Sequence, residues 1–283
     1  MINKTILIFV GLFLINCTSS KKTIHNTMYE TFGIAYSKIN LSEAEGYDLL
    51  IVEPYFYSKD EVAKFQAKGI KVIAYLSLGE VNESRKYFEE FKKVGFKGKN
   101  ENHGSFYTDL TNSKIKDKFI YNIVPELLSF GYDGLFLDTI DAVSPYTIRR
   151  EMRGDMVELI KSIRELNPSK ILIQNAGFFI LDETAELVNA IAIEDVASGY
   201  NFETDEYLVK SAQKFQERIE FIDELYQTYE IPFLIIDFAK DSSTEQVIVE
   251  RLDKTQFPYF ISNIGFKGLP SSNTKYLQIK EGV

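Results

Sequence analysis

Eight short apolar runs, spread over most of the chain, constrain the fold more than any other feature of the sequence. They are rich in Ile, Val and Leu and lack polar alternation, which is typical of parallel strands buried on both faces. The runs are Phe32 to Ser37, Leu49 to Pro54, Val72 to Glu80, Leu135 to Asp138, Ile171 to Gly177, Ile191 to Val196, Phe233 to Phe238 and Tyr259 to Ile264.

Most of the runs are separated by stretches with apolar residues three or four positions apart, which places those side chains on one face of a helix. The clearest face is Leu208, Ala212, Phe215, Ile219, Ile222 and Tyr226, opposite Lys210, Lys214, Glu217 and Glu220. Two more are Ile115, Phe119, Ile123 and Leu127, and then Met152, Met156, Leu159, Ile163 and Leu166, before Asn167 and Pro168.

Strands alternating with helices over roughly 250 residues predict an α/β fold of the (β/α)₈ TIM-barrel type. A Gly-rich dinucleotide loop is missing after the first run, which argues against a doubly wound open sheet. With 283 residues, 45% of them hydrophobic, the chain can bury one large core, whereas two ordinary domains would be a tight fit. We therefore expect a single barrel domain over residues 31–270, followed by a C-terminal tail over 271–283.

The first residues are typical of an export signal. Lys4 precedes an apolar run from Ile6 to Ile15, which is too short to span a bilayer as a mature helix but suits a signal-peptide core. The run ends in Leu14-Ile15-Asn16-Cys17, which resembles a bacterial lipobox. We expect residues 1–16 to be a lipoprotein signal peptide, Cys17 to be lipidated, and residues 17–30 to tether the domain to a membrane of the bacterial cell envelope.

Charge and cysteine content exclude several classes of function. Asp and Glu outnumber Lys and Arg by 41 to 32, so the net charge is −9 and nucleic acid is not an expected partner. Cys17 is the only cysteine, which excludes an internal disulfide and a Cys-based zinc site. A barrel of this size needs no partner to bury its core, so we expect a monomer.

The fourth run stops at a carboxylate, Asp138, and another, Asp141, follows three residues later. An ionised carboxylate beside an apolar interior is costly unless it is paired, hydrogen-bonded or used in chemistry. The carboxyl ends of parallel strands are where barrels bind ligands, so Asp138 is a candidate catalytic residue, although an isolated Asp here could also cap a turn.

Carboxylate chemistry is the kind that the other strand ends favour. The chain has two histidines, His25 in the expected tether and His103 in a long insertion, so neither a Ser-His-Asp triad nor a two-histidine metal site can be assembled on the strands. We expect no metal and no cofactor. Two carboxylates that flank a glycosidic bond are sufficient for hydrolysis.

Asp138 and Glu194 are the pair that we predict to be catalytic. They end the fourth and sixth runs, so both should project from one rim with the fifth strand between them. Glu194 follows Ile191-Ala192-Ile193, and partial burial should raise its pKa and suit it to the acid role. Asp138 is then the nucleophile of a retaining enzyme, if the two carboxyl groups lie about 5 to 5.5 Å apart.

Polar and aromatic residues at the other strand ends are candidates for binding a sugar, with rings stacking on its CH faces. The substrate-binding candidates are Tyr36, Glu53, Tyr75, Glu80, Asp141, Asn175, Tyr200 and Asp237. Several of them, Glu53, Glu80 and Asp237 above all, could instead hydrogen-bond one another or loop amides. We expect Asp133 and Asp195 to be structural.

The segment between Glu80 and Asp133 leaves a strand's carboxyl end, so it should form a wall or lid over the active face or else be a plain surface insertion.

These motifs also carry a family resemblance. The combination of Tyr75-Leu76-Ser77-Leu78-Gly79-Glu80, Gly131 to Asp141, Gln174-Asn175-Ala176-Gly177 and Glu194-Asp195 resembles glycoside hydrolase family 114, the endo-α-1,4-polygalactosaminidase-like barrels. The resemblance runs from about Phe32 to Gly268. It implies that an exported enzyme cleaves a galactosamine-containing polysaccharide, and that Asp138 and Glu194 are the catalytic pair. Trp is absent, so any stacking platform must be Tyr or Phe.

Two hypotheses from different classes follow. The first is a lipid-anchored glycoside hydrolase that acts on an amino-sugar polymer, whose positive charge would suit an acidic cleft. The second is a catalytically inactive, carbohydrate-binding surface lipoprotein that has kept the barrel.

Overall fold

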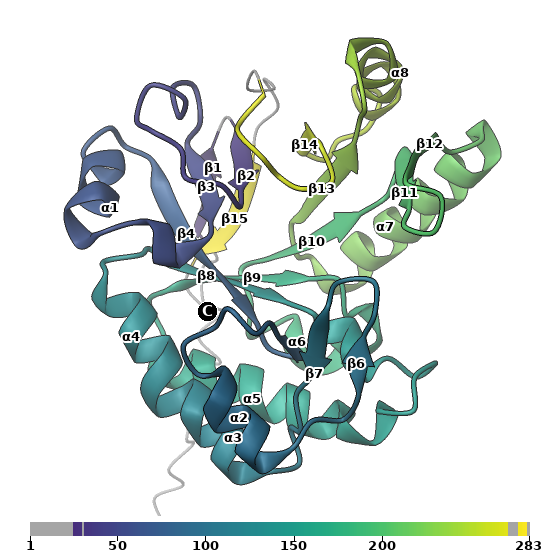
Figure 1. Ribbon diagram of the computed structural model, residues 1–283. Coiled ribbons are helices and arrows are strands. Elements are labelled where there is room, and N and C mark those ends of the chain that lie inside the picture. Colours follow the sequence, from purple (N-terminus) through teal and green to yellow (C-terminus); the bar gives the residue numbers. More distant parts are fainter. Residues whose placement is uncertain (1–24, 30, 271–276, 282–283) are drawn as a thin grey trace, which may run out of the picture.

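The computed structural model describes residues 25–29, 31–270 and 277–281. Its centre is an eight-stranded sheet in the order β14-β13-β10-β9-β8-β4-β3-β2, with all neighbouring pairs parallel (Figure 1). The strands are β2 (Phe32–Ala35), β3 (Leu49–Val52), β4 (Lys71–Ser77), β8 (Gly134–Asp138), β9 (Ile171–Asn175), β10 (Ala190–Glu194), β13 (Phe233–Phe238) and β14 (Tyr259–Ser262). Each lies within or overlaps one of the eight predicted runs.

The sheet curls into a barrel that is nearly closed. Strands β2 and β14 end the sheet, and they meet through the rings of Phe32 and Phe260, whose centroids are 5.9 Å apart. Beyond the strands, the amide of Tyr36 donates to the carbonyl of Phe266 at 2.9 Å. The strand interiors are buried, as the unbroken apolar runs predict. The predicted (β/α)₈ barrel is therefore confirmed as an architecture.

Helices cover the outside of the barrel (Figure 1). The α-helices are α1 (Lys59–Gln66), α2 (Phe88–Val94), α3 (Ser113–Lys118), α4 (Val124–Ser129), α5 (Arg153–Leu166), α6 (Leu181–Thr184), α7 (Ala212–Tyr229) and α8 (Ser242–Leu252). Short 3₁₀ turns follow three strands, namely η1 (Pro54–Phe56), η3 (Ile140–Val143) and η5 (Phe178–Ile180), and a fourth, η4 (Arg150–Met152), directly precedes α5. Helix α5 ends directly before Asn167 and Pro168, as predicted, although its last residue, Leu166, is 56% exposed and not part of the buried face.

The predicted helix through Ile115, Phe119, Ile123 and Leu127 is continuous but contains a π-helical turn, η2 (Phe119–Ile123), between α3 and α4. All four apolar side chains are buried. Pro125 has no amide hydrogen, and the helix widens in the turn just before it, where Val124 donates to the carbonyl of Phe119. A wider turn accommodates a proline that a regular α-helix would not.

The clearest predicted helix begins later than its periodicity indicates. Leu208 lies in β12 (Glu206–Val209), which pairs with β11 (Ser198–Asn201) as a hairpin, and its side chain is 48% exposed. Helix α7 starts at Ala212 because Ser211 caps it, accepting a hydrogen bond from the Lys214 amide at 3.2 Å. Lys210 is therefore outside the helix as well.

The long insertion after β4 forms a small antiparallel sheet in the order β5-β7-β6, beside helix α2. Its strands are β5 (Glu80–Val81), β6 (Lys99–Asn100) and β7 (Ser105–Tyr107). The β6–β7 hairpin lies near the β11–β12 hairpin, since the ring centroids of His103 and Phe202, at the tips of the two hairpins, are 5.0 Å apart.

Two short strands near the ends of the chain lie within the expected tether and tail. Strands β1 (His25–Tyr29) and β15 (Leu277–Glu281) pair with each other as an antiparallel ladder. The signal peptide of residues 1–16 and Cys17 lie outside the described residues. Within the described ranges, none of the helices is long and apolar enough to cross a bilayer.

Candidate active site

Asp138 and Glu194 meet at the carboxyl-terminal rim of the barrel through a shared partner, Asn175. These three residues end the neighbouring strands β8, β9 and β10, so the parallel sheet brings them together. The Nδ2 group of Asn175 donates to Asp138 Oδ1 and to Glu194 Oε1, at 2.8 Å each. The two carboxylate oxygens are therefore no further apart than twice 2.8 Å, or 5.6 Å.

The Asp138 carboxylate is fixed from two sides. Its other oxygen, Oδ2, accepts a hydrogen bond from the Tyr75 hydroxyl at 2.7 Å, across the ladder between β4 and β8. The Tyr75 ring in turn contacts the rings of Tyr36 and Phe136, with centroids 4.8 and 6.4 Å away. The Asp138 carboxylate is thus held by two donors on rigid strands.

The environment of Glu194 favours its protonated form. The pKa of Glu194 is raised from 4.5 to about 7, chiefly by burial and then by the nearby Asp138 charge, while the hydrogen bond from Asn175 acts in the opposite direction. A carboxylic acid with a pKa near neutrality can give a proton and later take one back. The expectation that burial raises the Glu194 pKa is confirmed.

The backbone turns left-handed directly after each of these three residues. Thr139, Ala176 and Asp195 have φ angles of 61°, 54° and 59°. This conformation costs a non-glycine residue about 1–2 kcal/mol, and the surrounding contacts must compensate for it. At Thr139 the hydroxyl accepts from the Gly79 amide at 2.8 Å and contacts Ser77 Oγ at 2.8 Å. The turns end each strand so that its last side chain stands at the rim.

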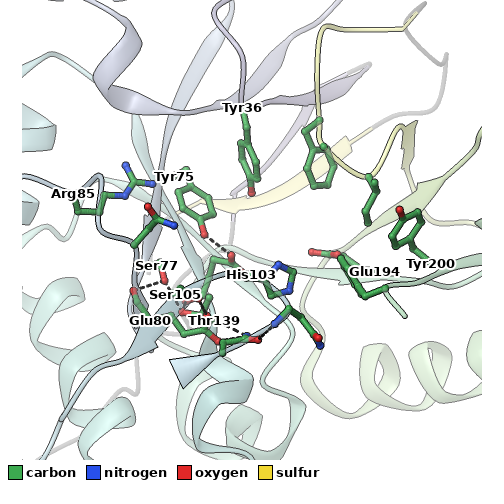
Figure 2. A pocket seen from close by; sticks show the side chains of 18 of the residues that line it. Tyr36, Tyr75, Ser77, Glu80, Arg85, His103, Ser105, Thr139, Glu194 and Tyr200 are labelled. Atoms are coloured by element: carbon green, nitrogen blue, oxygen red, sulfur yellow. Dashed lines mark hydrogen bonds between the residues drawn. The ribbon is translucent and has the colours of Figure 1, made fainter. Parts of the chain in front are cut away.

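A cavity of about 750 Å³ opens beside the pair (Figure 2). Four of the predicted binding residues line it, namely Tyr36, Tyr75, Glu80 and Tyr200, together with Asp138 and Glu194. The insertion supplies Glu80, Asn82, Arg85, Asn100, Asn102, His103 and Ser105. The insertion is therefore a wall of the cavity, as one of the two sequence interpretations predicts.

A second cavity, of about 300 Å³, adjoins the same carboxylates. It is lined by Asp138, Glu194 and Asn175, by the predicted binding residue Asp141, and by Asp195, which we expected to be structural. Asp141 accepts a hydrogen bond from the Gly177 amide at 3.2 Å, and Arg218 of α7 donates to the Glu194 carbonyl at 3.1 Å. Asp138 and Glu194 thus line both cavities.

Comparison with known proteins gives the family of the chain. The model of glycoside-hydrolase family GH114 matches residues 16–260. The chain belongs to glycoside-hydrolase family GH114. An uncharacterised protein of Methanocaldococcus jannaschii is 25% identical over 250 residues, covering 79% of this chain and 69% of the relative.

Solved structures share the fold of this GH114 chain. The glycoside hydrolase domain of PelA from Pseudomonas aeruginosa has a TM-score of 0.77 at 20% identity, covering 87% of this chain and 99% of that domain. Ega3 of Aspergillus fumigatus, solved in complex with galactosamine, has a TM-score of 0.66 at 12% identity, covering 86% of this chain and 94% of that one.

Two predicted binding residues lie elsewhere in this GH114 barrel. Asp237 has no exposed surface, and its carboxylate accepts from the amides of Val196, Ala197 and Ser198 at 2.8 to 3.1 Å, and from the Ser198 hydroxyl at 2.7 Å. It therefore holds the turn after β10 and is not accessible to a substrate. Glu53 is bound by Arg85 through two hydrogen bonds of 2.6 and 2.8 Å, so its charge is neutralised within the protein.

Asp133, which we expected to be structural, lies before β8, away from the rim. Its carboxylate accepts from Gln66 Nε2, Lys71 Nζ and the Val72 amide at 2.9, 3.1 and 2.9 Å.

Within the described ranges, no group of three or more His, Cys, Asp or Glu side chains is arranged to hold a metal ion.

Several cavity residues had no signal in the sequence. Arg85 lies over the rings of Tyr55 and Tyr75, 5.6 and 5.7 Å from their centroids, and His103 contacts the Phe202 ring at 5.0 Å between two hairpins. Both Arg85 and His103 are in the insertion, which could be predicted as a wall but not residue by residue. Phe202 is at a hairpin tip after β11, in a segment that periodicity assigns to no strand.

Proposed function

We propose that this GH114 chain is a retaining glycoside hydrolase that cleaves galactosamine-containing polysaccharide. The observation that carries the proposal is the bridge of Asn175 between Asp138 and Glu194, because it limits the separation of Asp138 Oδ1 from Glu194 Oε1 to 5.6 Å. That limit agrees with the spacing of about 5–5.5 Å in retaining enzymes and is shorter than the 6.5–9.5 Å that inverting enzymes need for a water molecule.

The substrate class rests on the family and on the cavity. Ega3 is solved with galactosamine, and its fold is shared by this chain. The cavity offers aromatic faces from Tyr36, Tyr75 and Tyr200, and carboxylates that suit a cationic amino sugar.

Each group has a defined part in the reaction. Protonated Glu194 gives its proton to the glycosidic oxygen while an Asp138 oxygen attacks the anomeric carbon, and the bond from that carbon to the leaving sugar breaks. Glu194, now ionised, takes a proton from a water molecule that attacks the same carbon and releases Asp138. The anomeric configuration is inverted twice and so retained.

The experiment is a hydrolysis assay with the domain lacking residues 1–20, incubated with galactosamine, glucosamine and neutral polymers. We expect oligosaccharides to be released from galactosamine polymer, and the first product seen by NMR to keep the substrate's anomeric configuration. Asp138→Asn and Glu194→Gln should each lower kcat by at least roughly 10³-fold while polymer binding persists. Turnover retained in either variant would remove that residue from the mechanism.

The same assay tests the alternative of an inactive carbohydrate-binding protein. The bridged carboxylate pair and the raised Glu194 pKa speak for catalysis. Binding of polymer by the wild-type domain without any product would speak for the alternative.

We further propose export and lipid anchoring at the bacterial cell envelope. The support is the sequence alone, namely Lys4, the apolar run from Ile6 to Ile15, and Cys17. Metabolic labelling with a radioactive fatty acid should mark the full-length protein but not Cys17→Ser. Equal labelling of both would exclude this cysteine as the anchor.

A further inference from the structure

A third carboxylate, that of Glu80, faces the main cavity. Glu80 begins β5, and Asn100 Nδ2 donates to its two carboxylate oxygens at 3.1 and 3.3 Å. The Ser105 hydroxyl donates to one of the same oxygens. Both donors come from the β6–β7 hairpin, so the carboxylate is held in one orientation at the wall (Figure 2).

The charge of Glu80 has no counter-ion among the residues that the structure describes. The ion pairs among the described residues involve other carboxylates, such as that of Glu53 with Arg85. The groups that donate hydrogen bonds to the Glu80 carboxylate are neutral. Asp138 and Glu194 serve the reaction, whereas Glu80 has no part in it. An ionised carboxylate in a partly enclosed cavity favours a cation from the ligand.

Glu80 is tied to the wall beside Asp138. Ser77 pairs with Asp138 in the β4–β8 ladder, and its hydroxyl donates to the Glu80 carbonyl at 2.7 Å. The same hydroxyl contacts Thr139 Oγ1, directly after Asp138, at 2.8 Å. The carbon of an amino sugar that bears the 2-amino group is bonded to the anomeric carbon that Asp138 would attack. The amine is therefore close to the reacting carbon, and Glu80 and Asp138 line the same cavity.

We propose that Glu80 determines specificity by binding the protonated 2-amino group of a galactosamine unit next to the scissile bond. This inference rests on the proposed function. A free amine is cationic at neutral pH and donates hydrogen bonds to a carboxylate, and such charge-assisted bonds are the strong ones. An N-acetyl group is uncharged and would place a carbonyl oxygen and a methyl group against the carboxylate, with at most one N–H to donate. The protein should therefore cleave deacetylated polymer in preference to acetylated polymer.

The test compares kcat/KM for fully deacetylated and fully N-acetylated galactosamine oligosaccharides of equal length. In wild type the deacetylated substrate should be preferred, and Glu80→Gln should lower its kcat/KM roughly 10- to 100-fold while the acetylated substrate is unchanged. Glu101→Gln is the matched control, because Glu101 is on the same hairpin, exposed and paired with Lys99 at 3.0 Å. The wild-type preference should also fade above the pKa of the sugar amine.

A second readout separates failure of this inference from failure of the proposed function. Calorimetric binding of both oligosaccharides is measured in the Asp138→Asn background, with and without Glu80→Gln. Preferential binding of the free amine that disappears in Glu80→Gln supports the inference even if wild type shows no turnover. Equal losses for both substrates, or no change on replacing Glu80, would overturn it.

Discussion

Asn175 sets the geometry of the site because its amide contacts both carboxylates. It is only 7% exposed, and its two hydrogen bonds of 2.8 Å determine how Asp138 and Glu194 face each other. We expect Asn175→Ala to lower kcat roughly 10- to 150-fold with little change in KM, since hydrogen bonds to charged groups contribute about 1.5–3 kcal/mol. Steady-state kinetics would measure this.

Asn175→Asp is the comparison variant. It keeps the size of the side chain but adds a third carboxylate against Asp138 and Glu194, so its loss of kcat should be larger than that of Asn175→Ala. An alanine variant with unchanged kcat would mean that strands β8 and β10 alone hold the pair.

Glu194 should destabilise the fold at alkaline pH. Burial raises its pKa from 4.5 to about 7, so between these values the folded protein keeps a proton that the unfolded chain has lost. The free energy of unfolding therefore falls as the pH rises through that window, and the cost is complete above pH 7. Glu194→Gln should raise stability by about 3 kcal/mol at pH 8 and by almost nothing at pH 4.5.

Urea denaturation at the two pH values would measure this difference. Glu101→Gln, the same change at an exposed position, should show no such dependence on pH. An equal gain for Glu194→Gln at both values would mean that packing and not ionisation is responsible.

The strands were predictable because each carries an unbroken apolar run, which is a local signal of burial on both faces. The rim carboxylates were predictable because strand direction places their ends together. Their supporting contacts were not, since Arg85 reaches Glu53 across a 32-residue separation along the chain and also lies over the Tyr75 ring. Asp237 also follows a strand pattern, but its partners are backbone amides after β10 that no side-chain pattern reveals.

The left-handed turns that end β8, β9 and β10 likewise had no sequence signal, because glycine is absent from all three positions. Ala176 has a φ of 54° and its amide donates to the Ala192 carbonyl at 2.9 Å. Ala176→Gly should leave stability unchanged or raise it by up to about 1 kcal/mol, whereas Ala176→Val should destabilise the fold by about 2 kcal/mol or more.

Chemical denaturation would measure both variants. Ala63→Gly is the control, because Ala63 is exposed within helix α1, where the same change should cost about 1 kcal/mol. A similar cost at Ala176 would show that its methyl contacts outweigh the backbone strain.

The whole molecule adds an electrostatic field to this local geometry. Its net charge is −9, and the main cavity is lined by Glu80, Asp138, Glu194 and Asp205, whereas the charge of Arg85 is taken up by Glu53. Such a field should attract a cationic polymer to the rim before any contact forms.

Salt should therefore slow the reaction on the charged polymer. Raising the ionic strength from 0.01 to 0.1 M shortens the Debye length from about 30 to about 10 Å, and we expect kcat/KM for deacetylated galactosamine polymer to fall roughly tenfold. Initial rates at low substrate concentration would measure this. The N-acetylated oligosaccharide is the uncharged control and should show no such fall. If kcat/KM fell equally for both substrates, salt would be acting on the protein itself and not on its attraction for a cationic substrate.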